Sequence, residues 1–210
     1  MGLFIPLIGI LVFILIIAYV FYEHFSDNYD KLKEKVKEMI LNTPLKEEFN
    51  ISQDEFFSAN FSRIAIDEQN KKIAIWKADE DSDPKNPTCQ TYVYRFDEIL
   101  EVELIENGQT ITRTSRGSQI AGAAVGGALL GGVGAVIGGL SGSTTSSDTI
   151  KNVDLKIVVN DFKKPFHKLR MLDSVLDMNG SELQRGTPLY DLHMNKVFHW
   201  HSILAYIIKL

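Results

Sequence analysis

The chain has 210 residues, enough for one compact domain together with an anchor and an insertion. Its formal net charge of −5 argues against a nucleic-acid-binding protein that works through a broad basic surface. Cys89 is the only cysteine, so a disulfide framework within one chain is excluded.

The N-terminal segment Leu3–Tyr22 has no charged side chain. At about 1.5 Å per residue, a helix of this length spans roughly 30 Å, the thickness of the hydrocarbon core of a bilayer. A cleaved signal peptide is disfavoured, because no Lys or Arg precedes the run and no small-x-small cleavage site follows it. Lysines follow the span, at Lys31, Lys33, Lys35 and Lys37. We therefore expect a single-pass protein of the cell membrane, anchored by residues 1–25, with the bulk of the chain cytoplasmic.

Residues 26–50 are predicted to form an amphipathic stalk helix and a linker. Ser26, Asp27 and Asn28 can cap a helix, and apolar residues then recur at helical spacing until Thr43-Pro44. The predicted helix covers residues 29–42. Its apolar stripe could pair with a second copy of the chain or pack on its own domain, and we favour packing on its own domain.

From Phe57 onward the apolar residues alternate with a period of two, which predicts strands. The pattern in segments 61–66 and 71–76 predicts a hairpin, and further strands are expected between residues 92 and 104. Asn107-Gly108 is a strong turn signal before a strand at 110–114. Two more strands are expected at 153–159 and 166–172.

The C-terminal segment is predicted to be helical, because Thr187 can cap a helix and Pro188 suits its first turn. About seven short antiparallel strands followed by one amphipathic helix predict an α+β, mainly β fold. The expected architecture is a small β-barrel or sandwich over residues 51–210, plugged at one end by the helix and interrupted by an insertion at 117–148.

The insertion contains the segment Gln119–Gly142, which is rich in Gly, Ala, Val, Leu and Ile. Small residues four apart on a helix let two helix backbones touch, as in the glycine zippers of membrane helices. The glycine pairs with this spacing are Gly122 and Gly126, Gly127 and Gly131, and Gly134 and Gly138.

Strands are predicted on both sides of this segment, so a single crossing of the bilayer would divide the barrel. The segment is therefore expected to leave and return on one face, as a helical hairpin whose arms are each roughly 16 Å long. The hairpin could be re-entrant, interfacial, or packed against the anchor or a neighbouring subunit. A flexible soluble loop is disfavoured, because Gly/Ser linkers are polar.

No catalytic constellation is evident. The glycine run has no Walker motif, and Gly132-x-Gly134 followed by Gly138 misses the dinucleotide-binding spacing. His199 and His201 are two residues apart on a helix and point to different faces, which argues against shared metal ligation. We expect no cofactor, no metal and no enzymatic activity.

A basic cluster lies near the strand predicted at 166–172. It includes His167 and four residues that are candidates for contact with lipid headgroups: Lys163, Lys164, Lys168 and Arg170. A solvated sheet edge explains the same lysines and is favoured on so acidic a chain.

Three segments carry a family resemblance: Tyr94-Arg-Phe-Asp-Glu-Ile-Leu100, Lys156-Ile-Val-Val-Asn-Asp161, and Trp200-His-Ser-Ile-Leu204. Through them the stretch from Phe61 to Ile208 resembles bacterial pleckstrin-homology (PH)-like domains, specifically uncharacterised membrane-anchored proteins with a glycine-zipper insertion. The resemblance implies a seven-stranded barrel with one C-terminal helix and no catalytic activity.

These features predict a non-enzymatic, membrane-tethered PH-like interaction module at the inner membrane face. Its partners would be the lipid bilayer, other copies of itself in a homo-oligomer, and an unidentified protein or peptide, with no nucleic acid. The alternative is a membrane-perturbing or pore-forming effector of the stress or anti-phage type, assembled through the glycine zipper.

Overall fold

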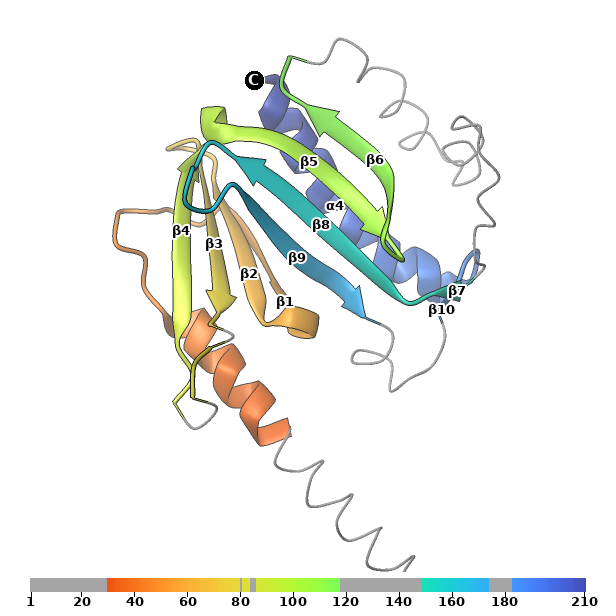
Figure 1. Ribbon diagram of the computed structural model, residues 1–210, viewed down its shortest axis with the longest axis horizontal. Coiled ribbons are helices and arrows are strands. Elements are labelled where there is room, and N and C mark those ends of the chain that lie inside the picture. Colours follow the sequence, from red (N-terminus) through yellow and green to blue (C-terminus); the bar gives the residue numbers. More distant parts are fainter. Residues whose placement is uncertain (1–29, 80, 84–85, 118–148, 174–182) are drawn as a thin grey trace, which may run out of the picture.

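Figure 1 presents a computed structural model of the chain, which describes residues 30–79, 81–83, 86–117, 149–173 and 183–210. The predicted anchor and the predicted zipper glycines lie outside the described residues. No helix within the described ranges has both the length and the apolar character that a membrane crossing requires.

The first sheet, sheet A, is an antiparallel meander in the order β1-β2-β3-β4. Its strands are β1 (Gln53–Phe57), β2 (Ser62–Asp67), β3 (Lys72–Ala78) and β4 (Cys89–Arg95), with a 3₁₀ turn, η1 (Ser58–Asn60), after β1. The predicted hairpin is confirmed as β2 and β3. Asp67 closes its turn by accepting hydrogen bonds from the backbone N–H groups of Asn50 (2.7 Å) and Asn70 (2.8 Å).

A 3₁₀ turn, η2 (Phe96–Glu98), leads from β4 into the second sheet, sheet B. Sheet B has the order β6-β5-β8-β9, and its strands are β5 (Ile99–Glu106), β6 (Gln109–Ser115), β8 (Asn152–Val159) and β9 (Phe166–Asp173). Asn107 and Gly108 have φ angles of 49° and 81°, which confirms the predicted turn between β5 and β6. Two short strands, β7 (Thr149–Ile150) and β10 (Leu183–Gln184), pair with each other.

The expected barrel is not closed, which corrects the prediction from the sequence. A closed barrel needs backbone hydrogen bonds between every pair of neighbouring strands, whereas sheets A and B are separate sheets. Side chains join the two instead: the rings of Tyr92 and Tyr94 on β4 lie 4.5 and 5.4 Å from the ring of His167 on β9. Asn60 adds a hydrogen bond to the carbonyl of Lys168 (3.2 Å).

The C-terminal helix α4 (Pro188–Lys209) covers the core between the sheets and packs mainly on β5 (Figure 1). Its predicted start is confirmed, since the Thr187 hydroxyl accepts a hydrogen bond from the Tyr190 N–H (3.2 Å) and Pro188 occupies the first turn. The residues that α4 buries in the core include Tyr190, Met194, Val197, Trp200, Leu204 and Ile208.

A helix over residues 30–42 packs on the outer face of sheet A, which confirms the stalk helix for its described part. Its buried residues Val36 and Ile40 form a cluster with Ala65, Ala74 and Trp76. Ala65 and Ala74 are directly paired across β2 and β3, so their small side chains leave room for the helix to approach the sheet. The Trp76 indole N–H then donates to the Thr43 carbonyl (2.9 Å), where the helix has ended.

We predict that this packing contributes strongly to stability. Ile40 is 0% exposed and Leu41 is 40% exposed, so the two neighbours form a matched pair. Ile40→Ala should lower the free energy of unfolding by about 2–5 kcal/mol, because it removes buried methyl groups and leaves a cavity. Leu41→Ala should change it by less than about 1 kcal/mol. Denaturant unfolding of the full chain in detergent measures both; equal effects would show that the helix is not docked.

Candidate functional site

The turn between β8 and β9, residues 160–165, is fixed by the side chain of Asp161. The carboxylate oxygen Oδ1 accepts hydrogen bonds from the backbone N–H groups of Lys163 (2.8 Å) and Lys164 (3.2 Å). The other oxygen, Oδ2, accepts one from the Tyr94 hydroxyl (3.3 Å). The bond from the Lys163 N–H is the main reason why the pKa of Asp161 lies below its usual value. The turn is therefore rigid and tied to sheet A.

This rigid turn presents apolar and basic side chains to solvent. Phe162 is 103% exposed and Phe166 is 48% exposed, while Lys163, Lys164 and Pro165 are also exposed. A fully exposed phenylalanine on an ordered turn stabilises nothing within its own domain. Aromatic side chains with this exposure, next to lysines, are typical of a contact point for another molecule.

Behind the turn lies a buried polar pair. His167 is fully buried, and its Nε2 atom lies 2.8 Å from the Tyr94 hydroxyl. Burial lowers the pKa of His167 to about 4, and the positive charges of Lys77 and Lys164 add to the effect. Burial is also the main reason why the pKa of Tyr94 is raised, and the nearby negative charge of Asp161 raises it further. Both side chains hold their neutral forms at neutral pH, so the pair supports the turn rather than exchanging protons.

The four predicted basic residues fall into two separate groups. Lys163 and Lys164 lie in the turn, where no acidic side chain of the described residues pairs with them. Lys168 and Arg170 lie on the outer face of β9 and both pair with Asp154 on β8, at 2.9 and 2.8 Å. They therefore cover a nearly buried carboxylate.

The same kind of pairing continues across the outer face of sheet B. Glu103 on β5, which is 3% exposed, pairs with Lys156 (2.9 Å) and Arg113 (3.1 Å) on the strands at either side. Burial alone would raise the pKa of Glu103, but the hydrogen bonds, led by the one from Lys156, outweigh it and lower the pKa to about 2. This face is a balanced network of ion pairs.

The two ends of the glycine-rich insertion are far apart on the domain. The Arg116 N–H donates to the Leu100 carbonyl (2.8 Å), whereas the Asn107 side chain donates to the Thr149 carbonyl (2.9 Å). Leu100 and Asn107 lie at opposite ends of β5, roughly 24 Å apart at about 3.4 Å per residue. The predicted hairpin lies outside the described residues, and the described residues on either side of it, Arg116 and Thr149, do not adjoin. The prediction that its flanking strands belong to one fold is confirmed, because β6 and β8 both pair with β5.

The sequence reasoning did not single out Phe162, Tyr94 or the burial of His167. One signal for Phe162 was present: Asn160-Asp161 marks a turn, so a phenylalanine directly after it has no place on a buried strand face. The contact between Tyr94 and His167 joins residues 73 positions apart and has no local signal.

We predict a loss of stability in mild acid that depends on two histidines. Burial lowers the pKa values of His167 and His201 from the usual 6.5 to about 4. The unfolded chain therefore binds more protons between these pH values, so stability present above pH 6.5 is lost as the pH falls toward 4. At about 1.4 kcal/mol per pH unit, each histidine accounts for roughly 3 kcal/mol.

His201→Leu and His167→Gln should each flatten this decline, measured as unfolding free energy against pH. The matched control is His199→Gln, since His199 is exposed at the surface of the same helix as His201. A decline that is equally steep in all three variants would contradict the assignment.

Comparisons with known proteins agree with this architecture. Residues 52–173 match the model of a family described as the glycine zipper containing PH domain. A protein of Bacillus phage SPbeta named "Immunity protein" is 29% identical over 185 residues, covering 87% of this chain and 85% of its own length. A Bacillus subtilis (strain 168) protein named "SPbeta prophage-derived uncharacterized membrane protein YomJ" is also 29% identical, covering 87% of this chain and 75% of its own length.

No solved structure matches the chain. The family match covers more than half of the sequence and includes both strands that flank the insertion. The resemblance predicted from the sequence is thus confirmed, and the chain belongs to the family of glycine-zipper-containing PH domains.

Proposed function

We propose that the chain is a non-enzymatic, membrane-tethered interaction module whose PH-like domain binds a protein or peptide at the inner face of the membrane. Membership of the family supports the PH-like domain and the zipper. The name of the Bacillus subtilis relative, a membrane protein, supports the tether. The proposed tether is the apolar segment Leu3–Tyr22, which is long enough to span a bilayer as a helix.

The observation that carries the proposal is the β8–β9 turn. Its hydrogen bonds to Asp161 hold Phe162 outward, so little conformational entropy is lost when the ring enters a pocket of a partner. Lys163 and Lys164 flank the ring and favour an acidic rim around that pocket. Lipid headgroups, which the sequence suggested as ligands of these lysines, are the competing partner.

Site-specific crosslinking tests this proposal. A photoreactive phenylalanine analogue is placed at Phe162 and, as a control, at Gln69, which is exposed in the β2–β3 turn. We expect a protein adduct from position 162 only, reduced at least several-fold when Lys163 and Lys164 are both changed to Glu. Equal adducts from both positions would remove the turn as the binding site. A lipid adduct at 162 would assign it to the membrane surface.

The glycine-rich segment is proposed to mediate helix packing or self-association. Because the flanking residues Arg116 and Thr149 are bonded to positions roughly 24 Å apart along β5, a simple deletion would strain the domain. Residues 119–142 are therefore replaced by a polar Gly/Ser linker of equal length. The replacement should lower the size of crosslinked oligomers in membranes and leave thermal unfolding of the domain unchanged. Gly126→Leu should act in the same direction and Gly126→Ala should not.

A second candidate is a membrane-perturbing effector of the stress or anti-phage type. The observation that favours it is the name of the relative from Bacillus phage SPbeta, "Immunity protein". Overexpression separates the two candidates: an interaction module leaves the membrane potential intact. An effector dissipates it, and Gly134→Leu relieves the effect.

A further inference from the structure

Helix α4 has a second apolar stripe on the side that faces away from the core. Leu192 and Tyr206 are 64% and 65% exposed, and Leu189 is 45% exposed. The terminal Leu210, four residues after Tyr206, is 64% exposed. A helix that only plugs its own core needs one apolar face and carries polar residues on the opposite one.

Two polar residues of α4 beside the stripe contact sheet A. Lys196 pairs with Glu55 on β1 (3.1 Å), and His199 lies 3.2 Å from the side-chain oxygen of Gln53 on the same strand. Lys209 is exposed at the C-terminal end of the helix. The exposed side of α4 also carries Asp191 and Asn195, so it combines apolar side chains with polar ones. This amphipathic character is typical of helices that lie at a membrane surface.

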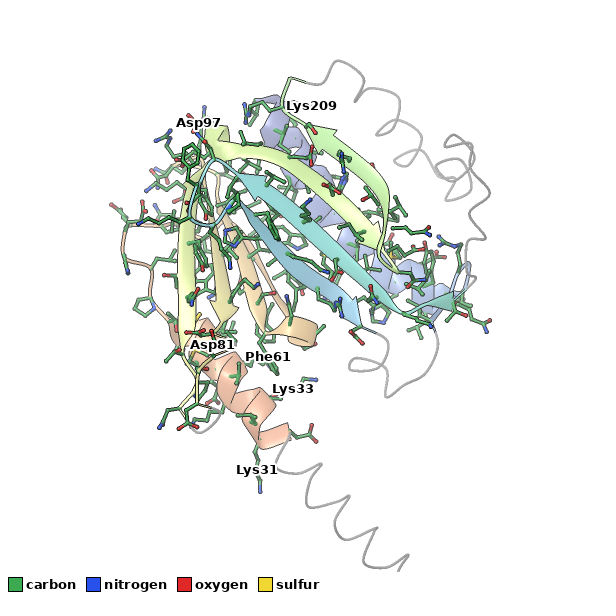
Figure 2. The ribbon with its side chains drawn as sticks, viewed as in Figure 1. Lys31, Lys33, Phe61, Asp81, Asp97 and Lys209 are labelled. Atoms are coloured by element: carbon green, nitrogen blue, oxygen red, sulfur yellow. The ribbon has the colours of Figure 1, made fainter. Side chains whose placement is uncertain are left out.

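The two points where the insertion joins the domain lie close to this apolar stripe of α4. Arg116 lies one residue before Gly117, the last described residue ahead of the insertion. It lines a cleft of about 360 Å³ together with Ile207 and Leu210. Asp97 also lines this cleft, and Figure 2 shows Asp97 and Lys209 at the same end of the molecule. The insertion thus begins beside the C-terminal end of α4.

The insertion returns at the other end of the same helix. Thr149 on β7 pairs with Gln184 on β10, three residues before the Thr187 cap of α4. Figure 1 shows β6 ending near the C-terminus and β7 lying beside β10 at the start of α4. Of residues 118–148, which join these two points, only Asp148 is charged. This almost uncharged stretch therefore leaves and rejoins the domain at the two ends of α4.

We infer that the outer face of α4 lies on the bilayer surface as an interfacial helix, beside the points where the insertion leaves and rejoins the domain. The inference rests on the proposed membrane tether and adds the orientation of the domain to it. It also assigns a role to Leu192 and Tyr206, which the fold itself leaves in solvent.

Depth-dependent fluorescence quenching tests this orientation. Starting from full-length Cys89→Ser, single cysteines are introduced at Leu192, at Tyr206 and, as a control, at Asp81, which is exposed in the β3–β4 loop away from α4 (Figure 2). Each is labelled with an environment-sensitive dye. The protein is reconstituted in phosphatidylglycerol and phosphatidylethanolamine vesicles, with and without brominated acyl chains, and acrylamide serves as the aqueous quencher.

Labels at 192 and 206 should be quenched at least twofold more by brominated lipid than the label at 81, and correspondingly less by acrylamide. Acrylamide quenching equal to that at 81 would overturn the inference. Protection from both quenchers would also overturn it, because the face would then be covered by protein, either the insertion or a second copy. Recovery of the protein in the soluble fraction without vesicles would instead contradict the membrane tether itself.

Discussion

The pairing of β5 with β6 on one side and β8 on the other is the constraint on which the arrangement of this protein depends. β6 and β8 are consecutive long strands in the sequence, yet β5 lies between them. The segment that joins them cannot be a short turn, because it must pass from one end of β6 to the opposite end of the sheet. A turn of a few residues would suffice only if β6 and β8 were neighbours. Any use of the insertion in a membrane is therefore coupled to the orientation of the whole domain.

The strand register determines which charged side chains of this domain pair with each other. The sequence groups Lys168 and Arg170 with Lys163 and Lys164 as one basic cluster. In the fold, Arg170 is directly opposite Asp154, and the carboxylate of Asp154 holds both Arg170 and Lys168. Removing Asp154 would leave two cations without this partner, so the charge balance between β8 and β9 depends on this buried acid.

Local signals in the sequence predicted most elements correctly. The alternation in β2, β3 and β8, the Asn107-Gly108 turn and the Thr187 cap are each properties of a few neighbouring residues, and the fold retains all of them. The sequence did not predict β1, in which Asp54 and Glu55 interrupt the alternation. β1 forms because it pairs with β2 along its whole length and because Asp54 binds Arg63. β7 and β10 are too short to carry a period of their own.

The features that the sequence missed depend on contacts between distant segments. Barrel closure was expected from a pattern of about seven strands, whereas the described residues form ten. Whether two edge strands pair depends on the side chains that lie between them. Here β9 comes closest to β1 and η1, without a backbone ladder between the two sheets, and the rings of Tyr92 and His167 pack across the core between the sheets. The same packing buries His167 and ties Asp161 to Tyr94, and so it also fixes the candidate turn.

The outer faces of the two sheets differ, and this difference limits where a partner can bind. The outer face of sheet A is apolar at Ala65, Ala74 and Trp76 and is covered by the helix over residues 30–42. The outer face of sheet B has its buried acids already paired with basic side chains. Neither face offers an unsatisfied surface within the described residues. Apolar side chains that the fold leaves in solvent are concentrated at the β8–β9 turn and along α4. Under the proposed function, a partner and the membrane would use the rim of the domain, because its broad faces are already occupied.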